Sequence, residues 1–452
     1  MRPRTLADVA AAVGGSTRDG DVVVTSLSTD SRTVEPGALF VAIHGEHADG
    51  HDHIAEAIAR GAAGSLVDRE VDGPSVRVRD TVRALLDLAS DERRAMRDVR
   101  LLAITGANGK TSTKDLAAGV LATRFRTHAS PRSFNNEIGL PVTLLDAPAG
   151  AEVIVAEMGA RRRGDVTLLC RVARPDVVVV TNVGVAHMEI FGSWDAIVQA
   201  SAEPVDALEA DGTAVLNADD PIVRGYCDRT AARVLTFGVA QDADVRAETI
   251  VLDGEGRASF DLVSADGREP VELSVAGEHM VSNALAAAAG AIALGVDPAE
   301  CAAALKDVRA SEWRMEVFSN ADGVVVVNDA YNANPESMAA GLRAARWIAR
   351  QGRMVAVLGH MAELGDIASD EHERLGELLV RLGVDRIVTV GDPARAIARA
   401  AVREGALPED VASYGDIDQA VADVRSWAVR GDVVLVKGSR VVGLERVAEA
   451  LR

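Results

Sequence analysis

The sequence lacks the features that mark membrane, secreted or nucleic-acid-binding proteins. Among its 452 residues, no apolar run approaches the ~18 residues needed to cross a bilayer. The first residues, MRPRTLADVAAAVGG, contain no long apolar segment of the kind that opens a secretory signal. The net charge of −20 opposes general attraction to nucleic acid or to an anionic membrane surface. We therefore expect a cytoplasmic protein that binds anionic small molecules at local positive sites.

Cysteine and lysine are also scarce. The cysteines are scattered and lack CxxC spacing, so nothing indicates a disulfide framework or a cysteine-based zinc site. They are Cys170, Cys227 and Cys301, which we interpret as small buried apolar residues. Arginine replaces lysine at almost every basic position, which singles out the few sites that keep a compact ammonium group. These four lysines, among 48 basic residues, are Lys110, Lys114, Lys306 and Lys437.

Length and composition predict three folded domains. The chain is too long for one ordinary core, and 48% hydrophobic residues allow each domain its own. From about Leu101, short β-branched runs alternate with helix-length segments, as in a parallel sheet covered by helices, and the alternation restarts near Val324. Residues 240–275 alternate like antiparallel strands joined by DG turns. We predict an α/β fold with a small domain at 1–97, a central parallel-sheet domain at 98–310 and a Rossmann-like domain at 311–452.

The segment TGANGKTSTKD, Thr105 to Asp115, has the composition of a phosphate-binding loop between a strand and a helix. Gly106 and Gly109 let backbone N–H groups turn toward phosphate oxygens, and the helix N-terminus adds positive potential. Lys110 is suited to reach the terminal phosphates, and Thr111 to offer a hydroxyl to Mg²⁺. Only two residues separate the glycines, fewer than in the common GxxxxGK[ST] form. We predict that the ATP-binding residues include Thr105, Gly106, Ala107, Asn108, Gly109, Lys110, Thr111 and Ser112.

Two further residues follow apolar strands of the same predicted sheet. Glu157 ends the run VIVA, where a carboxylate is costly unless it meets a cation. His187 follows VVVVT and the loop NVGVAH, at a strand end where α/β sheets place ligands. Alone, His187 would more often be a hydrogen-bonded structural histidine than a metal ligand. Beside a phosphate loop, we interpret Thr111, Glu157 and His187 as Mg²⁺ ligands.

Several other polar residues admit two interpretations. Asn217 and Asn283 are suited to contact an adenine edge, but also to form turns and helix caps. Arg314 is suited to close onto ATP phosphates and Asp329 to orient the ribose or that arginine, although either could be an ordinary surface charge. The segment VKGSR, with Lys437 to Arg440, follows an apolar strand, and we favour carboxylate binding there over a solvated turn.

In order and spacing, these segments resemble the Mur ligase family over essentially the whole chain. In that family TGxxGKT binds ATP, and the resemblance implies that Glu157 and His187 bind Mg²⁺ and that Asn283 contacts the adenine. It further implies that Arg314 and Asp329 belong to a mobile third domain that closes over the nucleotide. The implied catalytic residues are Lys110, Glu157, His187 and Arg314.

Within the family, DAYNANPESM, MAELG and KGSR are typical of members that join D-Ala-D-Ala to UDP-MurNAc-tripeptide. The resemblance implies that ATP activates the tripeptide carboxylate as an acyl phosphate, and that attack by the dipeptide amine gives UDP-MurNAc-pentapeptide, ADP and phosphate for peptidoglycan synthesis. STDSRTVEPGALFVAIHGEHADGHD is similar to the family's uridine-binding domain, and SFNNEIGLP to a loop that faces the UDP-sugar. The implied UDP-substrate contacts are Ser31, Arg32, Asn135 and Asn136. Those implied for D-Ala-D-Ala or a carboxylate are Tyr331, Asn332, Asn334, Lys437, Ser439 and Arg440.

One departure from the family pattern concerns a second metal ion. Most such ligases carry a carbamylated lysine in an AKxE segment after the histidine, whereas QASAEPVDAL places Ser201 there. A serine cannot form the stable carbamate, so the second metal site is built differently, weaker or absent. Met280 and His360 also stand where asparagine and aspartate are common. The alternatives are another Mur-type amino-acid ligase or a related binding protein with little activity. We expect a monomer that uses ATP, Mg²⁺ and small-molecule substrates, without nucleic-acid or membrane partners.

Overall fold

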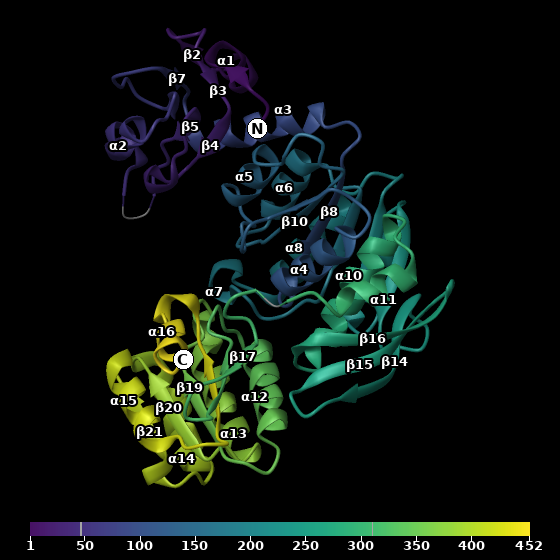
Figure 1. Ribbon diagram of the computed structural model, residues 1–452, viewed down its shortest axis with the longest axis vertical. Helices are drawn as coiled ribbons and strands as arrows, with labels where there is room; N and C mark the ends of the chain where they lie inside the picture. Colours follow the sequence, from purple (N-terminus) through teal and green to yellow (C-terminus); the bar gives the residue numbers. More distant parts are fainter. Residues whose placement is uncertain (46–47, 310) are drawn as a thin grey trace.

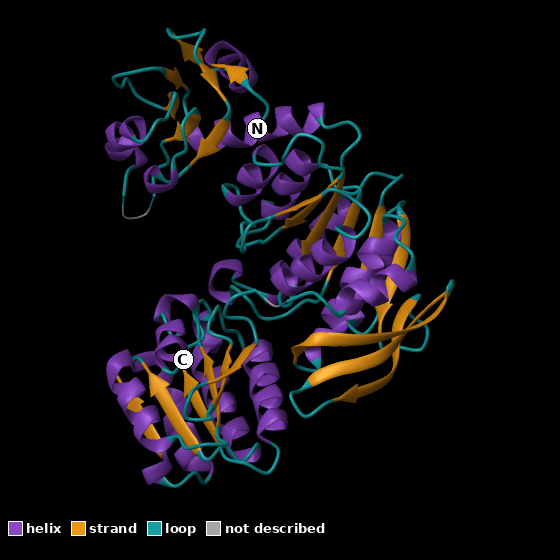
Figure 2. Ribbon diagram, in the orientation of Figure 1, coloured by secondary structure: helices purple, strands orange, loops and turns teal. Residues whose placement is uncertain are grey.

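The chain folds into three α/β units that follow one another along the sequence (Figure 1). The computed structural model describes residues 1–45, 48–309 and 311–452, so the predicted boundary at residue 310 lies outside the described residues. The predicted α/β architecture with three domains is confirmed, with helices packed on the sheets of each unit (Figure 2). No described helix combines the length and apolar character that a membrane span requires.

The N-terminal unit has a five-stranded sheet in the order β2-β7-β6-β5-β4 and a ribbon of β1 and β3. Strands β4 to β7 run parallel to their neighbours, and β2 is antiparallel to β7. The strands are β1 (Arg4–Thr5), β2 (Ser16–Thr17), β3 (Val23–Val24), β4 (Ser26–Ser28), β5 (Ala38–Val41), β6 (Gly64–Val67) and β7 (Ser75–Arg77). The helices are α1 (Leu6–Val13), α2 (Ile54–Ala59) and α3 (Thr81–Ala95).

Helix α3 joins this unit to the middle one. Its buried Leu85 and Leu88 belong to the same apolar cluster as Leu140 and Leu169 of the middle unit. Near its end, Arg93 donates a hydrogen bond of 2.7 Å to the carbonyl oxygen of Ala173 and further bonds to nearby carbonyls. The first two units therefore share part of one core.

The middle unit is built on a nine-stranded sheet in the order β16-β15-β14-β13-β12-β11-β8-β10-β9. Strands β9 to β14 pair in parallel, while β14, β15 and β16 form the antiparallel extension predicted at residues 240–275. The strands are β8 (Arg100–Thr105), β9 (Thr127–Ala129), β10 (Val153–Glu157), β11 (Val177–Val180), β12 (Thr213–Asn217), β13 (Arg233–Gly238), β14 (Val245–Leu252), β15 (Arg257–Ser264) and β16 (Gly267–Ala276). The helices are α4 (Lys110–Leu121), α5 (Gly139–Leu145), α6 (Asp165–Ala173), α7 (Met188–Phe191), α8 (Trp194–Asp206), α9 (Pro221–Arg224), α10 (His279–Ala293) and α11 (Pro298–Leu305).

The register of the central strands creates the edge that carries the predicted site. Strand β8 lies between β10 and β11, and its residues 101–104 are completely or almost completely buried. Glu157 at the end of β10 pairs with Ile104, and Val180 at the end of β11 pairs with Thr105. Because the three strands are parallel, the segments that follow them emerge side by side at one edge of the sheet.

The C-terminal unit has a six-stranded sheet in the order β17-β18-β22-β19-β20-β21. Only β17 is antiparallel to its neighbour, and separate apolar clusters involve alternate residues of the strands. The strands are β17 (Glu316–Ser319), β18 (Val325–Asn328), β19 (Met354–Leu358), β20 (Arg386–Val390), β21 (Val411–Tyr414) and β22 (Val433–Lys437). The helices are α12 (Pro335–Ala349), α13 (Ala368–Arg381), α14 (Arg395–Glu404), α15 (Ile417–Trp427) and α16 (Glu445–Ala450).

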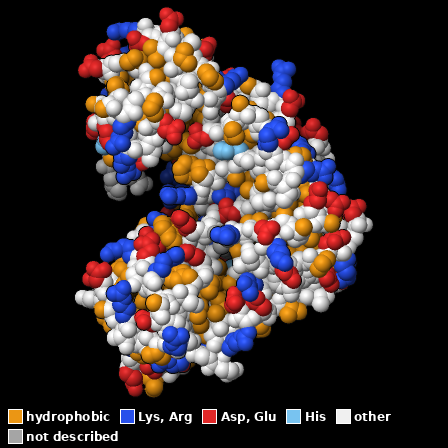
Figure 3. Space-filling view, viewed as in Figure 1, with side chains coloured by type: hydrophobic (Ala, Val, Ile, Leu, Met, Phe, Trp, Pro, Cys, Tyr) orange, Lys and Arg blue, Asp and Glu red, His pale blue; other side chains and the backbone are white. Residues whose placement is uncertain are grey.

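The arrangement of the units leaves a hollow on one side of the molecule. In Figure 3 the N-terminal and C-terminal units form two lobes that are separated by a deep recess, with the middle unit at its base. The third unit contacts the middle unit near α7, as Figure 1 shows. The predicted phosphate loop lies in the middle unit, beside this contact.

Candidate active site

The phosphate loop connects β8 to α4, and its glycines are required by close backbone packing. Gly109 has φ +80°, and a Cβ atom there would lie 2.2 Å from Asn283 Oδ1. A Cβ atom at Gly106, where φ is +135°, would lie 2.1 Å from Thr181 Oγ1. The N–H of Asn108 donates to Oδ1 of Asn182, in the segment after β11, at 2.8 Å. The loop is thus a narrow, preorganised turn, as the sequence predicted.

Lys110 stands in the first turn of α4 and folds back over this loop. Its ammonium group donates to the carbonyl oxygens of Gly106 at 2.6 Å and Ala107 at 3.2 Å. Desolvation by burial lowers the pKa of Lys110, while the nearby Glu157 carboxylate acts in the opposite direction. Because only carbonyl oxygens of the loop accept these bonds, the ammonium is placed to exchange them for phosphate oxygens. Ser112 lies half-buried in the same first turn of α4.

Oxygen atoms suited to a divalent cation gather beside Lys110. Thr111 Oγ1 donates to Glu157 Oε2 at 2.7 Å and lies 2.8 Å from Ser133 Oγ. Glu157 is 1% exposed, and its other oxygen accepts from Asn135 Nδ2 at 2.8 Å. Hydroxyl and carboxylate oxygens are the ligands that Mg²⁺ prefers, so this set fits the ion. Asn135, which we predict to face the UDP-sugar, orients Glu157 in this arrangement.

Arg314 of the C-terminal unit reaches into the same oxygen cluster. Its Nη2 atom donates to Thr111 Oγ1 at 2.8 Å and to Ser133 Oγ at 3.3 Å. The guanidinium carbon lies 4.1 Å from the ring centroid of Tyr331. The Arg314 guanidinium of the third unit thus lies beside the oxygen cluster. Its Nε–H donor is buried and has no hydrogen-bond partner among the described residues.

His187 contacts the third unit, and no hydrogen bond joins it to Glu157 among the described residues. Its Nδ1 atom contacts Glu363 Oε2 by a short hydrogen bond, and Arg161 lies 3.5 Å from the other oxygen of Glu363. Both His187, at φ +56°, and Glu363, at φ +60°, adopt the left-handed conformation. Burial lowers the pKa of His187, although Glu363 acts to raise it. The three predicted Mg²⁺ ligands are therefore only partly assembled, with Thr111 and Glu157 together and His187 held by Glu363.

The other residues predicted in the C-terminal unit gather at the ends of β18 and β22. Lys437 is 2% exposed, and its Nζ atom lies 2.5 Å from Asp329 Oδ2 and 3.0 Å from the carbonyl oxygen of Asn332. Asn334 caps α12 and donates to Asn108 Oδ1 at 2.7 Å, which links the third unit to the phosphate loop. In this arrangement Lys437 already holds a carboxylate, that of Asp329.

Ser439 and Arg440 flank the same strand end. Ser439 Oγ accepts from the N–H of Ala362 at 2.8 Å, so it fixes the segment before Glu363. Arg440 pairs with Glu445 at 2.8 Å and stacks on Trp313, with half of its side chain exposed. A 3-10 turn (Arg440–Val442) follows the strand and leads to α16. Of the two predicted cations, only Arg440 is open to solvent.

The asparagines named from the sequence take different roles. Asn283 lies against Gly109, and its Nδ2 atom points to Met280 Sδ at 3.4 Å. Asn217 Oδ1 accepts from the N–H of Asp219 at 2.9 Å, which fits the turn-forming interpretation, and its Nδ2 atom donates to the carbonyl oxygen of Thr181 at 2.7 Å. Asn136 accepts from two backbone N–H groups at the start of α5. Asn283 is thus placed beside the phosphate loop, whereas the other two stabilise local backbone.

The predicted uridine contacts lie in the N-terminal unit, away from these residues. Ser31 is buried and donates to Glu56 Oε2 at 2.8 Å. Arg32 is exposed and forms a two-bond ion pair with Asp30 at 2.9 and 2.7 Å. The UDP-substrate residues therefore fall into two groups, Ser31 and Arg32 in the first unit and Asn135 and Asn136 in the second.

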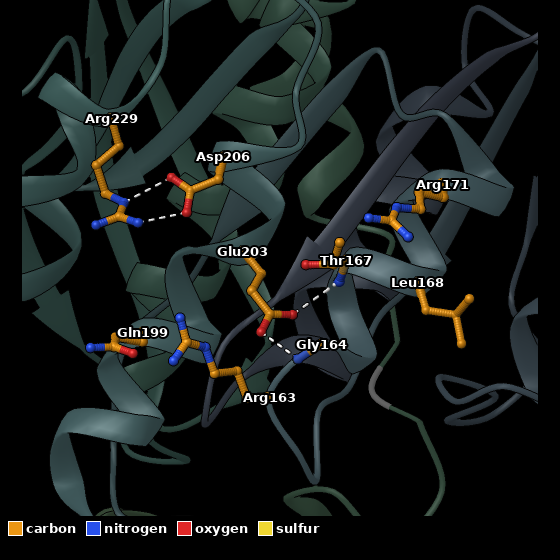
Figure 4. A pocket seen from close by; sticks show the side chains of 9 residues that line it. All are labelled: Arg163, Gly164, Thr167, Leu168, Arg171, Gln199, Glu203, Asp206 and Arg229. Atoms are coloured by element: carbon orange, nitrogen blue, oxygen red, sulfur yellow. Dashed lines mark hydrogen bonds and ion pairs between the residues drawn. The ribbon is translucent and has the colours of Figure 1, made fainter.

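Ser201 faces the interior of the middle unit. Its hydroxyl donates to the carbonyl oxygen of Val198 at 2.8 Å and lies 2.6 Å from the Tyr226 hydroxyl. The neighbouring Glu203 accepts from the N–H groups of Gly164 at 2.6 Å and Thr167 at 3.0 Å, in the polar pocket between α6 and α8 that Figure 4 shows. Both side chains are occupied by structural bonds, and neither contacts His187 in the described part of the chain.

Sequence reasoning missed three residues that shape the site. Ser133 and Asn182 hold the oxygen cluster and the phosphate loop, and Glu363 holds His187 from another domain. Each lies in a segment singled out from the sequence, Ser133 in SFNNEIGLP, Asn182 in NVGVAH and Glu363 in MAELG. The partner of Glu363 could not be read from the sequence, since the two residues are 176 positions apart.

Comparison with known families gives one consistent result. The model described as "Mur ligase family, catalytic domain" matches residues 23–91, "Mur ligase middle domain" matches 104–291 and "Mur ligase, glutamate ligase domain" matches 313–440. These matches follow the order of the three structural units. Each falls within one unit of the fold.

Individual relatives match over nearly the full length. The chain is 42% identical to the UDP-N-acetylmuramoyl-tripeptide--D-alanyl-D-alanine ligase of Mycobacterium tuberculosis, across 99% of this chain and 97% of the relative. The solved structure of MurF from Acinetobacter baumannii superposes with a TM-score of 0.89 at 30% identity, covering 99% of this chain and 98% of that one. MurF ligase from Thermotoga maritima in complex with ADP superposes with a TM-score of 0.81 at 30% identity, covering 94% and 96%.

Proposed function

The chain belongs to the Mur ligase family, and from this premise we propose how its own residues carry out the reaction. It is a MurF-type ligase, which uses ATP to join D-Ala-D-Ala to UDP-MurNAc-tripeptide in peptidoglycan synthesis. The contact between Arg314 of the third unit and Thr111 of the phosphate loop carries the proposal. It supports an active site formed between the middle and C-terminal units.

We assign ATP to the phosphate loop. The N–H groups at the start of α4 and the Lys110 ammonium bind the phosphates, and Asn283 lies beside the loop where the adenine would extend. Thr111 and Glu157 would hold Mg²⁺, with His187 joining them after it leaves Glu363. Mg²⁺ bound there supplies positive charge that offsets the phosphate oxygens. Arg314, with its unpartnered Nε, moves from Thr111 to the γ-phosphate.

Charge neutralisation is the main work of these residues. A carboxylate is a poor acylating group, and transfer of the γ-phosphoryl group converts it to an acyl phosphate with a good leaving group. Two anions must approach each other for this step, and Lys110 and Arg314 reduce their repulsion and align them. The incoming amine then attacks the acyl carbon and phosphate leaves. Exclusion of water between the closed units protects the acyl phosphate from hydrolysis.

The recess between the lobes supports the proposed path of the long substrate (Figure 3). We assign the uridine end to Ser31 and Arg32 in the N-terminal unit, and the peptide end to the contact between the other two. Tyr331, Asn332, Asn334 and the exposed Arg440 lie on the third unit, where the dipeptide would enter. We propose that the enzyme acts as a monomer in the cytoplasm, the compartment that supplies ATP.

The first test is product formation from ATP, D-Ala-D-Ala and UDP-MurNAc-tripeptide, followed by mass spectrometry. We expect Lys110→Ala to lower kcat/KM at least about 100-fold, because it removes a preorganised cation from the developing charge. Lys306→Ala is the matched control, since Lys306 is an exposed lysine paired only with Glu272. Wild-type protein that binds all three substrates but yields no product would favour the alternative of a binding protein. Equal activity in the two variants would remove Lys110 from the mechanism.

A further inference from the structure

The N-terminal unit contains a cluster of histidine and aspartate that the ligase reaction does not use. Four of the nine histidines of the chain lie between positions 44 and 53. Two of them, His44 and His51, approach Asp68 so that one ligand atom from each residue lies within 4.8 Å of the others. Among the described residues, this is the only such group of three.

The strand order brings these residues together. His44 follows β5 and Asp68 follows β6, and these strands are parallel neighbours, so both side chains emerge at the same edge of the sheet. His51 lies in the 3-10 helix Gly50–His53, which returns the chain to that edge. A backbone bridge between His44 and Asp49 closes the intervening loop. The cluster is therefore positioned by the sheet and not only by the loop.

Asp49 orients both histidine rings in the same way. His51 Nδ1 lies 2.7 Å from Asp49 Oδ1, and His44 Nδ1 lies 3.3 Å from Asp49 Oδ2. The opposite ring atoms face Asp68, with His44 Nε2 at 2.7 Å from Oδ2 and His51 Nε2 at 3.2 Å from Oδ1. Arg69 holds Asp49 at 2.9 Å. A carboxylate that binds the far nitrogen of a histidine is the usual support of a metal-ligating imidazole.

Burial makes the cluster partly rigid and partly accessible. The side chain of His51 is 1% exposed, whereas that of His44 is 53% exposed and can adjust its ring. The rings are stacked, with centroids 4.9 Å apart. Two hydrogen bonds occupy the proposed ligand nitrogens, His44 Nε2 with Asp68 Oδ2 at 2.7 Å and the N–H of Asp68 to His51 Nε2 at a long 3.2 Å, and a metal ion would replace both. The site thus has a fixed ligand, a movable ligand and an open side for water.

We propose that His44, His51 and Asp68 form a binding site for a divalent transition-metal ion such as Zn²⁺ or Ni²⁺, with Asp49 as the supporting carboxylate. Two imidazoles and one carboxylate suit these ions better than Mg²⁺, which prefers oxygen ligands. The site is independent of the ATP site and of the proposed catalytic residues. It lies one turn before α2, whose Glu56 holds Ser31, so a bound ion would brace the segment assigned to uridine.

The test is calorimetric titration of chelator-treated full-length protein with Zn²⁺ and Ni²⁺, in excess Mg²⁺ so that the oxygen cluster is already filled. We expect one site in the wild type, and affinity at least about tenfold weaker in His44→Ala, Asp68→Asn and Asp49→Asn. Because His44 is exposed, His44→Ala should fold normally. His53→Ala is the matched control, since His53 is an exposed histidine of the same segment whose ion pair within the described residues is with Glu56, at 3.8 Å.

Absorption spectroscopy with Co²⁺ gives a second readout that does not depend on enzyme activity. The wild type should show the d–d bands of a nitrogen and oxygen site, and His44→Ala should lose them while His53→Ala keeps them. Absence of binding in the wild type, or equal affinity in the wild type, His44→Ala and Asp68→Asn, would overturn the proposal. Loss of binding in His53→Ala alone would place the metal ion elsewhere and would also overturn it.

Discussion

At the scale of single residues, Ser201 shows how one substitution changes a local structure. The position where the family resemblance implies a lysine is filled here by a hydroxyl bound to Val198 and Tyr226. We expect Ser201→Ala to lower the free energy of unfolding by about 0.5–1.5 kcal/mol, since one hydrogen-bonded hydroxyl is lost. Because the hydroxyl faces the interior, kcat should stay unchanged and should not respond to bicarbonate. Urea unfolding and steady-state kinetics measure the two effects.

Tyr226→Phe supplies the matched control for this prediction. It removes the partner hydroxyl, so the double variant should lose less stability than the sum of the two single variants. A fall in kcat for Ser201→Ala without any loss of stability would show instead that the hydroxyl acts in the metal site. The bonds of Ser201 could not be predicted, because Tyr226 belongs to a turn 25 residues further along the chain.

Residues that depend on neighbours in the sequence were predictable, and those that depend on distant contacts were not. Gly106, Gly109 and Lys110 form a contiguous loop whose composition specifies its geometry, and Glu157 stands out as a carboxylate that ends an apolar strand. Lys437 was singled out correctly as unusual, but the single sequence could not reveal its pairing with Asp329, 108 residues away. A buried lysine is equally suited to bind the carboxylate of a substrate and to form an ion pair within the protein. Only the fold shows that Lys437 forms the internal ion pair in this conformation.

At the scale of elements, the segment 361–365 depends on a buried histidine of α13. His372 Nε2 accepts from the N–H of Met361 at 2.9 Å, and Nδ1 donates to the carbonyl oxygen of Ala368. Burial lowers the pKa of His372, even though the Ala368 carbonyl and Glu371 raise it. When the segment 361–365 opens and exposes His372, the pKa of this histidine returns to its ordinary value near 6.5. His372 therefore binds a proton at a higher pH in the open state than in the closed state. The closed segment is therefore fully stable above about pH 6.5 and loses stability as the pH falls toward the lower folded pKa.

We expect amide exchange at Met361, corrected for its intrinsic pH dependence, to be faster at about pH 5.5 than at about pH 7.5. His372→Gln should remove this pH dependence, because glutamine does not titrate. His128→Gln is the control, since His128 is also a buried histidine with a lowered pKa, but it bonds to Thr143 in the middle unit. Protection at Met361 that is independent of pH in the wild type would refute this account of the segment.

The histidine cluster at the end of β5 and β6 belongs to the same scale. Its spacing, with residues 44, 51 and 68, matches no short metal-binding motif, so the local sequence pattern did not predict a metal site there. The available signal was the concentration of four histidines within ten residues. Only the parallel pairing of the two strands places Asp68 beside them. A site assembled across strands is visible in the fold and not in the local pattern.

At the scale of the whole molecule, several polar contacts join the middle and C-terminal units, and three of them involve residues of the candidate site. Arg314 binds Thr111, Asn334 binds Asn108, and Glu363 binds His187. Two of these contacts engage groups that ATP and Mg²⁺ require, since Thr111 and His187 are proposed ligands. We therefore expect nucleotide binding to break these two contacts and to change the position of the third unit.

We expect small-angle X-ray scattering to show a changed radius of gyration when a non-hydrolysable ATP analogue and Mg²⁺ are added, and a further change with UDP-MurNAc-tripeptide. Lys110→Ala should show a smaller response at the same ligand concentration, because its phosphate loop holds the nucleotide less tightly. Glu363→Gln should weaken the contact with His187 and let the same shift occur at lower nucleotide concentration, since less of the binding energy is used to separate the units. The scattering could stay constant while calorimetry confirms nucleotide binding. That result would mean that Arg314 and Glu363 leave their partners by side-chain rotation alone, without movement of the domain that carries them.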